Sequence, residues 1–426
     1  MDAPRMSSRL YACSLTQYVF RSVLRSGDVS VGVQRHRFAT VLLRPSTLSV
    51  HSRLLHQEPR SSYPHLMLAI IFAINAILSA EGRTTLSKKH GRTPQFDFDR
   101  YHDYYEMKRY MLSVAAMNPE FVRLRDIGTT HEGRRLLGLK AHIGYPASAI
   151  NKRAVWLDGG NHAREWPAFH TALFFIDQLV TNYGIDESIT NYINKLNIYV
   201  FPVLNPDGFE YSLTSDEGLI RHWRKNRAPE NCTGRLGSRE DVCCMGVDLN
   251  RNFDFAFAPH SVPYNNPCSD EFQGPYPFSE PETRAIRDFM FSSEIYGRLD
   301  ALVSLHTYGQ LFIFPYNHQR RNYPKDIHDL RSLAEKAADE IRAFRGTKYK
   351  LGTAADILAP ATGGAIDWIK KFTPTKYVYV VELPPRLSSW FGFQMKPHWL
   401  LPTAQETWHG MRVIIDQVLH EANLDD

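Results

Sequence analysis

The residues with the clearest capacity for chemistry are a histidine and a glutamate three positions apart and one distant histidine. His162 and Glu165 lie in the segment HAREW, and His306 directly follows the apolar run at 303–305. Two imidazoles and one carboxylate form a typical ligand set for catalytic zinc, which leaves a position open for water. Zinc acidifies this water and polarises a carbonyl group. Each short match alone is more often structural, so the prediction of a zinc site depends on the rest of the chain.

Short apolar runs alternate along the chain with segments of helical spacing. Strands are predicted at 154–157, 196–204, 301–305, 311–314 and 377–383, and helices at 166–181, 326–345 and 403–422. Strands that alternate with helices indicate an α/β sheet with helices on both faces. Functional sites in such sheets gather where strands end, and His162 and His306 are expected at these ends.

Six sequence blocks occur in an order that resembles the pancreatic carboxypeptidase A/B family of zinc carboxypeptidases, and the A-type in particular. The resemblance runs from about Asp97 to the end of the chain, and its blocks are HAREW at 162–166, WRK at 223–225, DLNRNF at 248–253, SLHTYGQ at 304–310, GGAIDW at 363–368 and VEL at 381–383. It implies a single-domain zinc carboxypeptidase fold, an α/β structure with a twisted mixed sheet. It also implies one zinc ion per chain, and peptide or protein substrates with a free C-terminus.

The resemblance assigns catalytic roles to residues in these blocks. The zinc ligands are expected to be His162, Glu165 and His306. Glu382 is expected to be the general base, because a carboxylate beside a cation can take a proton from water and pass it to the leaving amine. Arg224 is expected to stabilise the oxyanion of the tetrahedral intermediate. Asp248 matches the residue that fixes a ligand histidine through its second ring nitrogen.

The resemblance also assigns residues to substrate binding. Asn250 and Arg251 resemble the clamp for the terminal carboxylate of the substrate, because a guanidinium fork matches two carboxylate oxygens. Ile366 lies where the family places the floor of the pocket, so an apolar or aromatic C-terminal residue is expected there. Family positions along the substrate path are occupied by Arg164, Tyr308 and Phe393.

Two positions depart from the family pattern. Ala359 stands where the family has a mobile tyrosine that closes over bound substrate, and Asn317 stands where a pocket residue is usually small. Loss of one phenol donor costs roughly 1 kcal/mol, which favours weaker catalysis rather than none. The alternative is a catalytically weak or silent zinc-binding relative that binds peptides or matrix proteins. A hydrolase of another amide fits less well, because it would not need the carboxylate clamp.

The N-terminal part differs in composition from the rest. Residues 1–65 hold nine arginines, no lysine and three acids, whereas the body is close to neutral and shows no basic run that would favour a nucleic-acid partner. This basic extension is typical of an organelle transit peptide or, if translation begins at Met67, of a gene-model artefact. The apolar segment 66–80 suits a secretory signal and is too short for a stable membrane anchor. Residues 81–96 are predicted to be a linker and 97–426 the catalytic domain of a secreted, extracellular monomer without a folded pro-domain.

Four of the five cysteines lie close together in the body, namely Cys232, Cys243, Cys244 and Cys268. An even, clustered set favours two disulfides and an oxidising compartment. Three pairings are open, although adjacent cysteines very rarely bridge each other. Zinc binding by these four is disfavoured because no CxxC pair occurs. The family's bridge corresponds to Cys244–Cys268, which leaves Cys232 to pair with Cys243.

Overall fold

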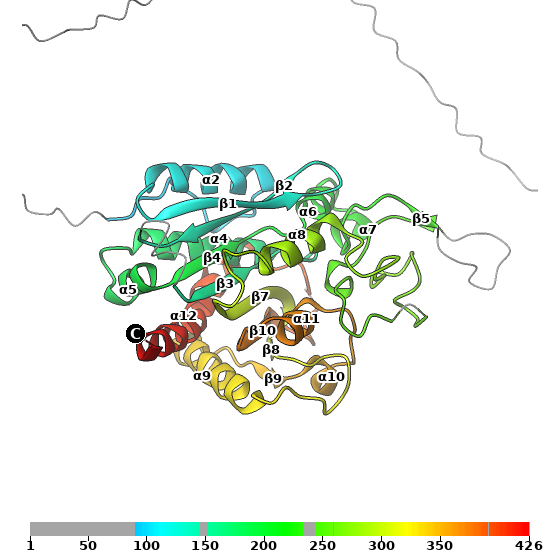
Figure 1. Cartoon of the computed structure of the whole chain (residues 1–426). Coiled ribbons are helices and arrows are strands. Elements are labelled where there is room, and N and C mark those ends of the chain that lie inside the picture. Colours follow the sequence, from blue (N-terminus) through cyan, green and yellow to red (C-terminus); the bar gives the residue numbers. More distant parts are fainter. Residues whose placement is uncertain (1–89, 145–151, 233–242, 259, 391, 426) are drawn as a thin grey trace, which may run out of the picture. The chain divides into compact units, whose positions relative to one another are not determined.

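Two long parallel strands place the predicted zinc ligand His306 beside the predicted base Glu382. β7 (Leu299–Gly309) pairs with β10 (Tyr377–Arg386), and the two residues stand opposite each other in the register. Both strands belong to the single compact unit that contains all described residues. The computed structural model describes residues 90–144, 152–232, 243–258, 260–390 and 392–425 (Figure 1).

Six further strands extend this pair into a mixed sheet. Their bounds are β1 Val122–Thr129, β2 Arg135–Ala141, β3 Ala154–Asp158, β4 Asn197–Phe201, β8 Leu311–Ile313 and β9 Lys350–Gly352. Within the described residues the sheet has eight strands in the order β1-β2-β4-β3-β7-β10-β8-β9. Strands β4, β3, β7 and β10 run parallel, β1–β2, β2–β4 and β10–β8 pair antiparallel, and β8–β9 is parallel. The catalytic candidates therefore come from the parallel centre of the sheet.

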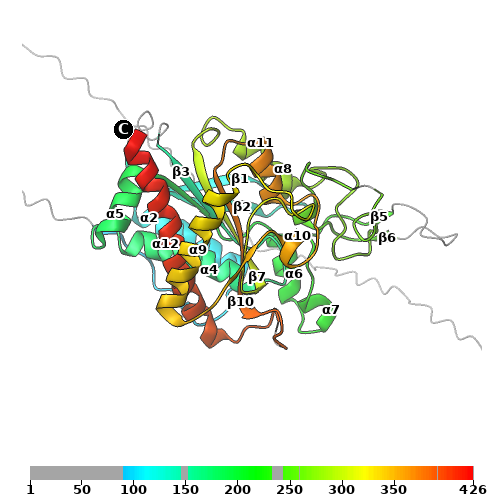
Figure 2. The same ribbon diagram turned by 90° about the horizontal axis from the view of Figure 1, so that it is seen from below.

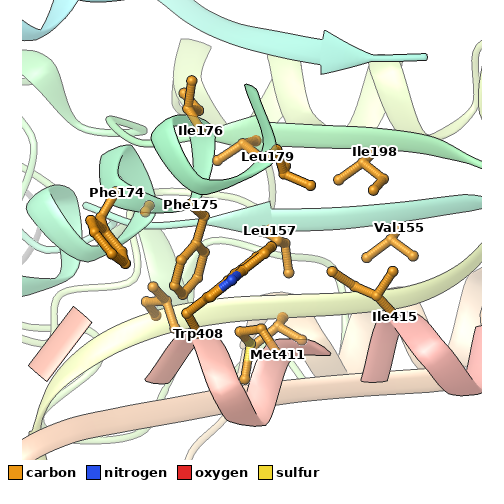
Figure 3. Close-up of a cluster of buried hydrophobic side chains, with 14 of the residues drawn as sticks. Val155, Leu157, Phe174, Phe175, Ile176, Leu179, Ile198, Trp408, Met411 and Ile415 are labelled. Atoms are coloured by element: carbon orange, nitrogen blue, oxygen red, sulfur yellow. The ribbon is translucent and has the colours of Figure 1, made fainter. Parts of the chain in front are cut away.

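Side chains of the central strands alternate between two cores, one on each face of the sheet. In β3, Leu157 belongs to one core and Trp156 to the other. Strands that are buried on both faces are typical of a sheet covered by helices. Figure 3 shows the first core, where Leu157 lies beside Phe175 and Trp408. The ring centroids of Phe175 and Trp408 are 5.3 Å apart, so the two helices that carry these residues pack against each other on this face of the sheet.

Helices cover both faces of the sheet (Figure 2). The first core is closed by α2 (Tyr104–Met117), α4 (Trp166–Thr181), α5 (Glu187–Lys195), α9 (Ile327–Arg345) and α12 (Leu400–Asp425). The second core is closed by α8 (Pro281–Met290) and α11 (Ala365–Phe372). Shorter helical segments are α6 (Pro206–Leu213), α7 (Gly218–Arg221), α10 (Ala354–Ile357) and the 3-10 turns η1 (Leu249–Arg251) and η2 (Pro397–Trp399).

Local sequence signals explain where several helices begin and end. The Asp103 side chain accepts a hydrogen bond from the backbone N–H of Glu106, whose side chain accepts one from the Asp103 backbone, so α2 starts with a capping box. Helices α4 and α8 each carry a proline in the first turn, where a missing N–H costs nothing. Helix α9 ends at Gly346 in the left-handed conformation.

The predicted fold class is confirmed, and the differences lie at the ends of elements. The strand predicted at 196–204 is shorter, because the chain leaves the sheet before Pro206, which starts α6. The strand predicted at 301–305 extends over Leu299–Gly309, so His306 lies inside the strand rather than after it. The hairpin of β1 and β2 and the helix α2 were not predicted. Burial in β1 is mixed and β2 is buried at all but its first residue, so neither strand shows a clear period of two.

The last residues of the predicted linker 81–96 contact the body of the protein. Residue Gly91 donates a backbone hydrogen bond to Tyr183, and the ring of Phe96 stacks on His102 at 3.9 Å. Residues 91–96 therefore pack on the body, because Phe96 anchors a stretch that is otherwise polar. The predicted extension 1–65, the signal-like segment 66–80 and the first part of the linker lie outside the described residues. Among the described helices, none is both long and apolar enough to cross a bilayer.

Two disulfides tie the irregular segments beside the sheet. Cys232–Cys243 joins the short strands β5 (Asn231–Cys232) and β6 (Cys243–Cys244). Cys244–Cys268 connects β6 to the segment 260–280. This is the pairing that the family resemblance implied. The second bridge fixes a segment that contributes residues to the cavity described below.

Candidate functional site

A glycine turn after β3 delivers His162 and Glu165 to the edge of the sheet. Gly160 has φ +67°, and a Cβ there would lie 2.3 Å from the Phe169 ring. A Cβ on Gly159 would lie 2.5 Å from the Ala168 carbonyl oxygen, so α4 packs directly against this turn. Only glycine fits such close approaches. The turn thus holds Glu165, the residue before the first turn of α4, next to the end of the parallel strands.

The three predicted zinc ligands converge on one point and are almost fully buried. His162 Nδ1 lies 2.8 Å from Glu165 Oε1, and His306 Nδ1 lies 2.9 Å from Glu165 Oε2. The two Nδ1 atoms are 3.1 Å apart. The exposed fraction of each residue is 3% or less. One nitrogen from each imidazole and one carboxylate oxygen from Glu165 therefore face a common centre.

The hydrogen bonding of His162 shows that this cluster fits a cation. The far ring nitrogen, Nε2, lies 3.1 Å from Asp248 Oδ1. The ionised carboxylate accepts a hydrogen bond there from Nε2–H, so in the neutral ring the Nδ1 lone pair of His162 points at the Glu165 carboxylate. Two acceptors at that distance repel each other unless a cation lies between them. Two imidazoles and a carboxylate are the donors that catalytic zinc takes, and a carboxylate behind one imidazole is a typical support.

Asp248 connects the zinc ligand to the predicted oxyanion donor. Its Oδ2 accepts a hydrogen bond of 2.8 Å from Arg224 Nε, and its Oδ1 accepts a bond of 2.9 Å from the Asn250 backbone. Burial acts to raise the pKa of Asp248, but the charges of Arg224 and His162 outweigh it and hold that pKa well below its usual range. Asp248 therefore stays ionised and fixes both neighbours.

Glu382 faces the same centre from β10. Burial, followed by repulsion from the Glu165 carboxylate, raises the pKa of Glu382 to about 8. A dication held by the ligands acts in the opposite direction and lowers this pKa. The proton affinity of Glu382 is thus raised by burial and by Glu165 and would be lowered by a bound metal. A general base needs such a proton affinity, between that of a free carboxylate and that of a group that stays protonated.

A cavity of about 330 Å³ joins these residues to the predicted substrate clamp. Its charged and polar lining residues include His162, His306, Arg224, Asn250, Arg251, Tyr264, Glu271 and Glu382. Its apolar lining residues include Leu358 and a group from the second core, namely Ile313, Ile366, Val380 and Ala354. The cavity can therefore accept a ligand with a charged end group and an apolar side chain.

The clamp residues are held against the loop before α11. Asn250 Oδ1 accepts a 2.9 Å hydrogen bond from the Ala365 backbone, which leaves its amide N–H groups as donors. Gly363 has φ +64°, and a Cβ there would lie 2.0 Å from the Arg251 carbonyl oxygen. The first glycine of the Gly-Gly pair is therefore required by the close approach of two backbones.

Asn317 lines the cavity, but its polar atoms are already used. Its side-chain amide donates to Asp367 at 2.9 Å, and its oxygen accepts a 2.6 Å bond from the Ala354 backbone. Asn317 therefore stabilises the pocket wall and offers little hydrogen bonding to a ligand. Ala359 and Pro360 also line the cavity, at its exposed rim.

Three predicted substrate residues do not line this cavity. The rings of Tyr308 and Phe393 meet edge to face at 4.9 Å, and the Arg164 guanidinium lies 4.4 Å above Phe393. Arg164 also donates a 2.8 Å hydrogen bond to Asp270. These residues form a separate cluster that adjoins the site through Glu165, the neighbour of Arg164. The structure thus brings the ligands, Asp248, Arg224, Glu382, Asn250, Arg251 and Ile366 together, and leaves these three beside them.

Sequence reasoning missed two polar residues of the cavity, Tyr264 and Glu271. The Tyr264 hydroxyl donates a 3.2 Å hydrogen bond to the Pro360 carbonyl, and Glu271 Oε2 lies 3.6 Å from Arg251 Nη2. Both residues come from an irregular segment without periodicity. The available signal was the Cys244–Cys268 pairing, which predicts that the segment returns to the residues before Asp248.

A second group of possible metal ligands lies outside the cavity and consists of His131, Glu280 and Glu282. The side chain of Asn226 donates hydrogen bonds to both carboxylates, at 2.7 Å to Glu280 and 3.0 Å to Glu282. His131 Nε2 lies 2.9 Å from Glu280. Because Glu280 is already bonded by Asn226, His131 and the Ser279 hydroxyl, and Glu282 by Asn226 through one oxygen, the group is assigned no metal.

Comparison with known proteins agrees with this geometry. Residues 107–410 match the sequence profile of the family described as zinc carboxypeptidase. Carboxypeptidase A2 of Mus musculus is 36% identical over 346 residues, which cover 81% of this chain and 77% of that protein. Carboxypeptidase B of Astacus astacus is 34% identical over 322 residues, which cover 76% of this chain and 98% of that protein. The chain is thus similar to both A- and B-type enzymes.

Solved structures show the same similarity. Carboxypeptidase A from Helicoverpa armigera superposes with a TM-score of 0.66 at 28% identity and covers 83% of this chain and 81% of its own. Bovine thrombin-activatable fibrinolysis inhibitor, in complex with tick carboxypeptidase inhibitor, superposes with a TM-score of 0.64 at 29% identity. It covers 76% of this chain and 99% of its own.

The shared hydrogen bonds of Asp248 lead to a prediction about metal binding. Asp248→Asn removes the charge that holds the His162 ring, so zinc affinity should fall about 10- to 100-fold. Competition of the purified protein with a chelator measures this change. Asp254→Asn, which removes an exposed acid outside the cavity, should leave the affinity unchanged. Equal affinity of the Asp248 variant and the wild type would show that the hydrogen bond does not support the ligand.

Proposed function

Because the chain belongs to the zinc carboxypeptidase family, we propose that it is a secreted metallocarboxypeptidase that prefers apolar or aromatic C-terminal residues. One observation carries this proposal. A single cavity joins the zinc-ligating histidines and Glu382 to Arg251 and to an apolar wall around Ile366. A peptide C-terminus has the matching parts, which are a carbonyl, a terminal carboxylate and a side chain.

Glu382 moves the protons of the reaction. Zinc held by His162, Glu165 and His306 supplies Lewis acidity toward water and the scissile carbonyl. Glu382 takes the proton of the attacking water at its carboxylate and passes it to the nitrogen of the leaving residue. Its place opposite His306 on the neighbouring strand keeps this carboxylate beside the metal ligands.

Two arginines stabilise the negative charges of substrate and intermediate. Arg224, fixed through Nε by Asp248, directs its remaining N–H groups toward the ligand cluster, with Nη1 at 3.9 Å from Glu165. It stabilises the oxyanion as the carbonyl becomes tetrahedral. Asn250 and Arg251 bind the terminal carboxylate and exclude internal peptide bonds, because only a free C-terminus offers two charged oxygens.

The role of Glu382 is tested by removing its charge. Glu382→Gln should retain zinc, since the three ligands remain, and should lose peptide hydrolysis by about 10²- to 10⁴-fold in kcat. His306→Ala should instead lose the metal, which elemental analysis of the purified protein measures. Equal activity of wild type and Glu382→Gln would rule out the assignment.

Ala359 favours a second candidate function, a weak or silent zinc-binding relative that binds peptides. The residue contributes only a methyl group to the exposed rim of the cavity. A binder of this kind would retain zinc and bind free C-termini, and wild type and Glu382→Gln would both be inactive. The retention of Glu382, Arg224 and Arg251 in one cavity supports the enzyme, since a binder needs no base.

The apolar wall supports the proposed preference for apolar ends. Ile366 is 3% exposed and packs with the second core beside Val380 and Ile313. A charged side chain that entered here would lose hydration without gaining a partner. An aromatic or aliphatic side chain gains roughly 25 cal/mol per Å² of buried apolar area.

The preference is tested with matched peptides that end in Phe, Leu, Lys and Glu. We expect kcat/KM to be highest for the Phe and Leu peptides. Ile366→Asp should shift the preference toward Lys, because a buried carboxylate needs a cationic partner. The control Ile366→Leu keeps the wall apolar and should keep the order of substrates. Faster release of Lys than of both Phe and Leu by the wild type would contradict the role of Ile366.

Secretion is supported by the two disulfides, which are typical of oxidising compartments. The apolar segment 66–80 ends in small residues that suit signal cleavage, so a mature chain starting near Glu81 is expected. Sequencing the N-terminus of material recovered from the culture medium measures this start. Recovery of secreted chains that retain residues 1–65 would show that the segment is not a cleaved signal.

A further inference from the structure

An acidic residue lines the cavity beside the arginine of the proposed clamp. Glu271 Oε2 lies 3.6 Å from Arg251 Nη2, and both side chains face the same cavity. The Glu271 side chain is 41% exposed, whereas that of Arg251 is 12% exposed. The pair is thus an ion pair that is too long for a hydrogen bond and has water on its acidic side.

Arg251 does not depend on Glu271 for its position. Its Nη1 donates a 2.9 Å hydrogen bond to the Asn250 carbonyl, and its guanidinium lies 5.8 Å from the centre of the Tyr264 ring. The Gly363 backbone packs directly against the Arg251 backbone. The geometry of the guanidinium is therefore set by other contacts, and the Glu271 carboxylate adds charge rather than support.

Glu271 is itself held in place. Its segment is tied by the Cys244–Cys268 disulfide, and its backbone N–H donates a 3.0 Å hydrogen bond to the Ser269 hydroxyl. Tyr264, in the same segment, is bonded to the Pro360 carbonyl across the cavity rim. These contacts restrain the backbone that carries the Glu271 carboxylate.

We propose that Glu271 is a specificity-determining residue that weakens the binding of a terminal carboxylate by competing for Arg251. The inference rests on the proposed function, which assigns Arg251 to the substrate's terminal carboxylate. An N–H edge of a guanidinium that binds one carboxylate is not available to a second, and a substrate carboxylate on Arg251 would be repelled by the Glu271 carboxylate beside it. A C-terminal carboxamide differs, because its N–H group can donate to Glu271 while its oxygen accepts from Arg251. Glu271 thus reduces the discrimination between free and amidated C-termini.

The test measures binding and turnover separately. Two probes, N-acetyl-Phe-Phe and its C-terminal amide, are titrated into zinc-loaded full-length protein that carries Glu382→Gln, so that neither is consumed. Adding Glu271→Gln should lower the Kd of the free acid about twofold to fivefold, as expected for a partly exposed ion pair, and should not lower that of the amide. In the otherwise wild-type enzyme, Glu271→Gln should lower KM by the same factor and leave kcat unchanged.

Two controls separate this effect from a general loss of charge or of folding. Asp254→Asn removes an exposed acid near Arg251 in the sequence but outside the cavity, and should leave both Kd values unchanged. Glu271→Asp keeps the charge and should leave the Kd of the free acid near that of the parent protein. Thermal unfolding of each variant shows that the fold is retained.

Several results would overturn the inference. A higher Kd of the free acid after Glu271→Gln would show that Glu271 orients Arg251. An equal change for acid and amide, no change, or no binding of the free acid would show that the two carboxylates do not compete. Failure of the proposed function looks different, because wild-type protein would then not hydrolyse the peptide while the Kd ratio still responds to Glu271→Gln.

Discussion

The site depends on one buried carboxylate that serves two partners. Asp248 is fully buried and binds His162 through one oxygen and Arg224 through the other. A buried charge is tolerated only when it is paired and hydrogen-bonded, so the positions of all three side chains are coupled. The metal ligand and the oxyanion donor are therefore oriented by the same residue. Because Asp248 immediately precedes η1, the clamp residue Arg251 is positioned by the same stretch of backbone.

The sheet supplies the second half of this arrangement through its register. His306 and Glu382 stand opposite each other on parallel strands and share the face that bears Leu302 and Val380. A shift of one residue would turn Glu382 toward the other core, where Val381 packs. Because side chains of β7 and β10 alternate between the two cores, packing on both faces fixes the base relative to the ligands. Strain or flexibility is not needed to explain the geometry.

The residue types that carry the chemistry could be predicted from the sequence, whereas the full lining of the cavity could not. His162 and Glu165 carry a local signal, and His306 follows a strong apolar run, and the ordered blocks along the rest of the chain turn these weak signals into a prediction of zinc. Tyr264 and Glu271 carry no such signal, because irregular segments have no period from which direction can be inferred. Their place in the cavity follows from a disulfide and from loop contacts made far along the chain. The end of β7 was underestimated for a related reason, since polar residues at a strand end resemble the start of a loop.

The substitution at position 359 has a consequence that is visible only in three dimensions. Ala359 adjoins Pro360, whose carbonyl accepts a hydrogen bond from the Tyr264 hydroxyl of another segment of the chain. The rim of the cavity thus still carries a phenol, but its proton is already donated to the backbone. To donate to a ligand instead, the Tyr264 hydroxyl would have to leave the Pro360 carbonyl without that partner, so the exchange brings little net gain. Under the proposed function, binding of a terminal carboxylate therefore relies on Asn250 and Arg251. The charge placed beside Arg251 is then more important than it would be with an additional free donor.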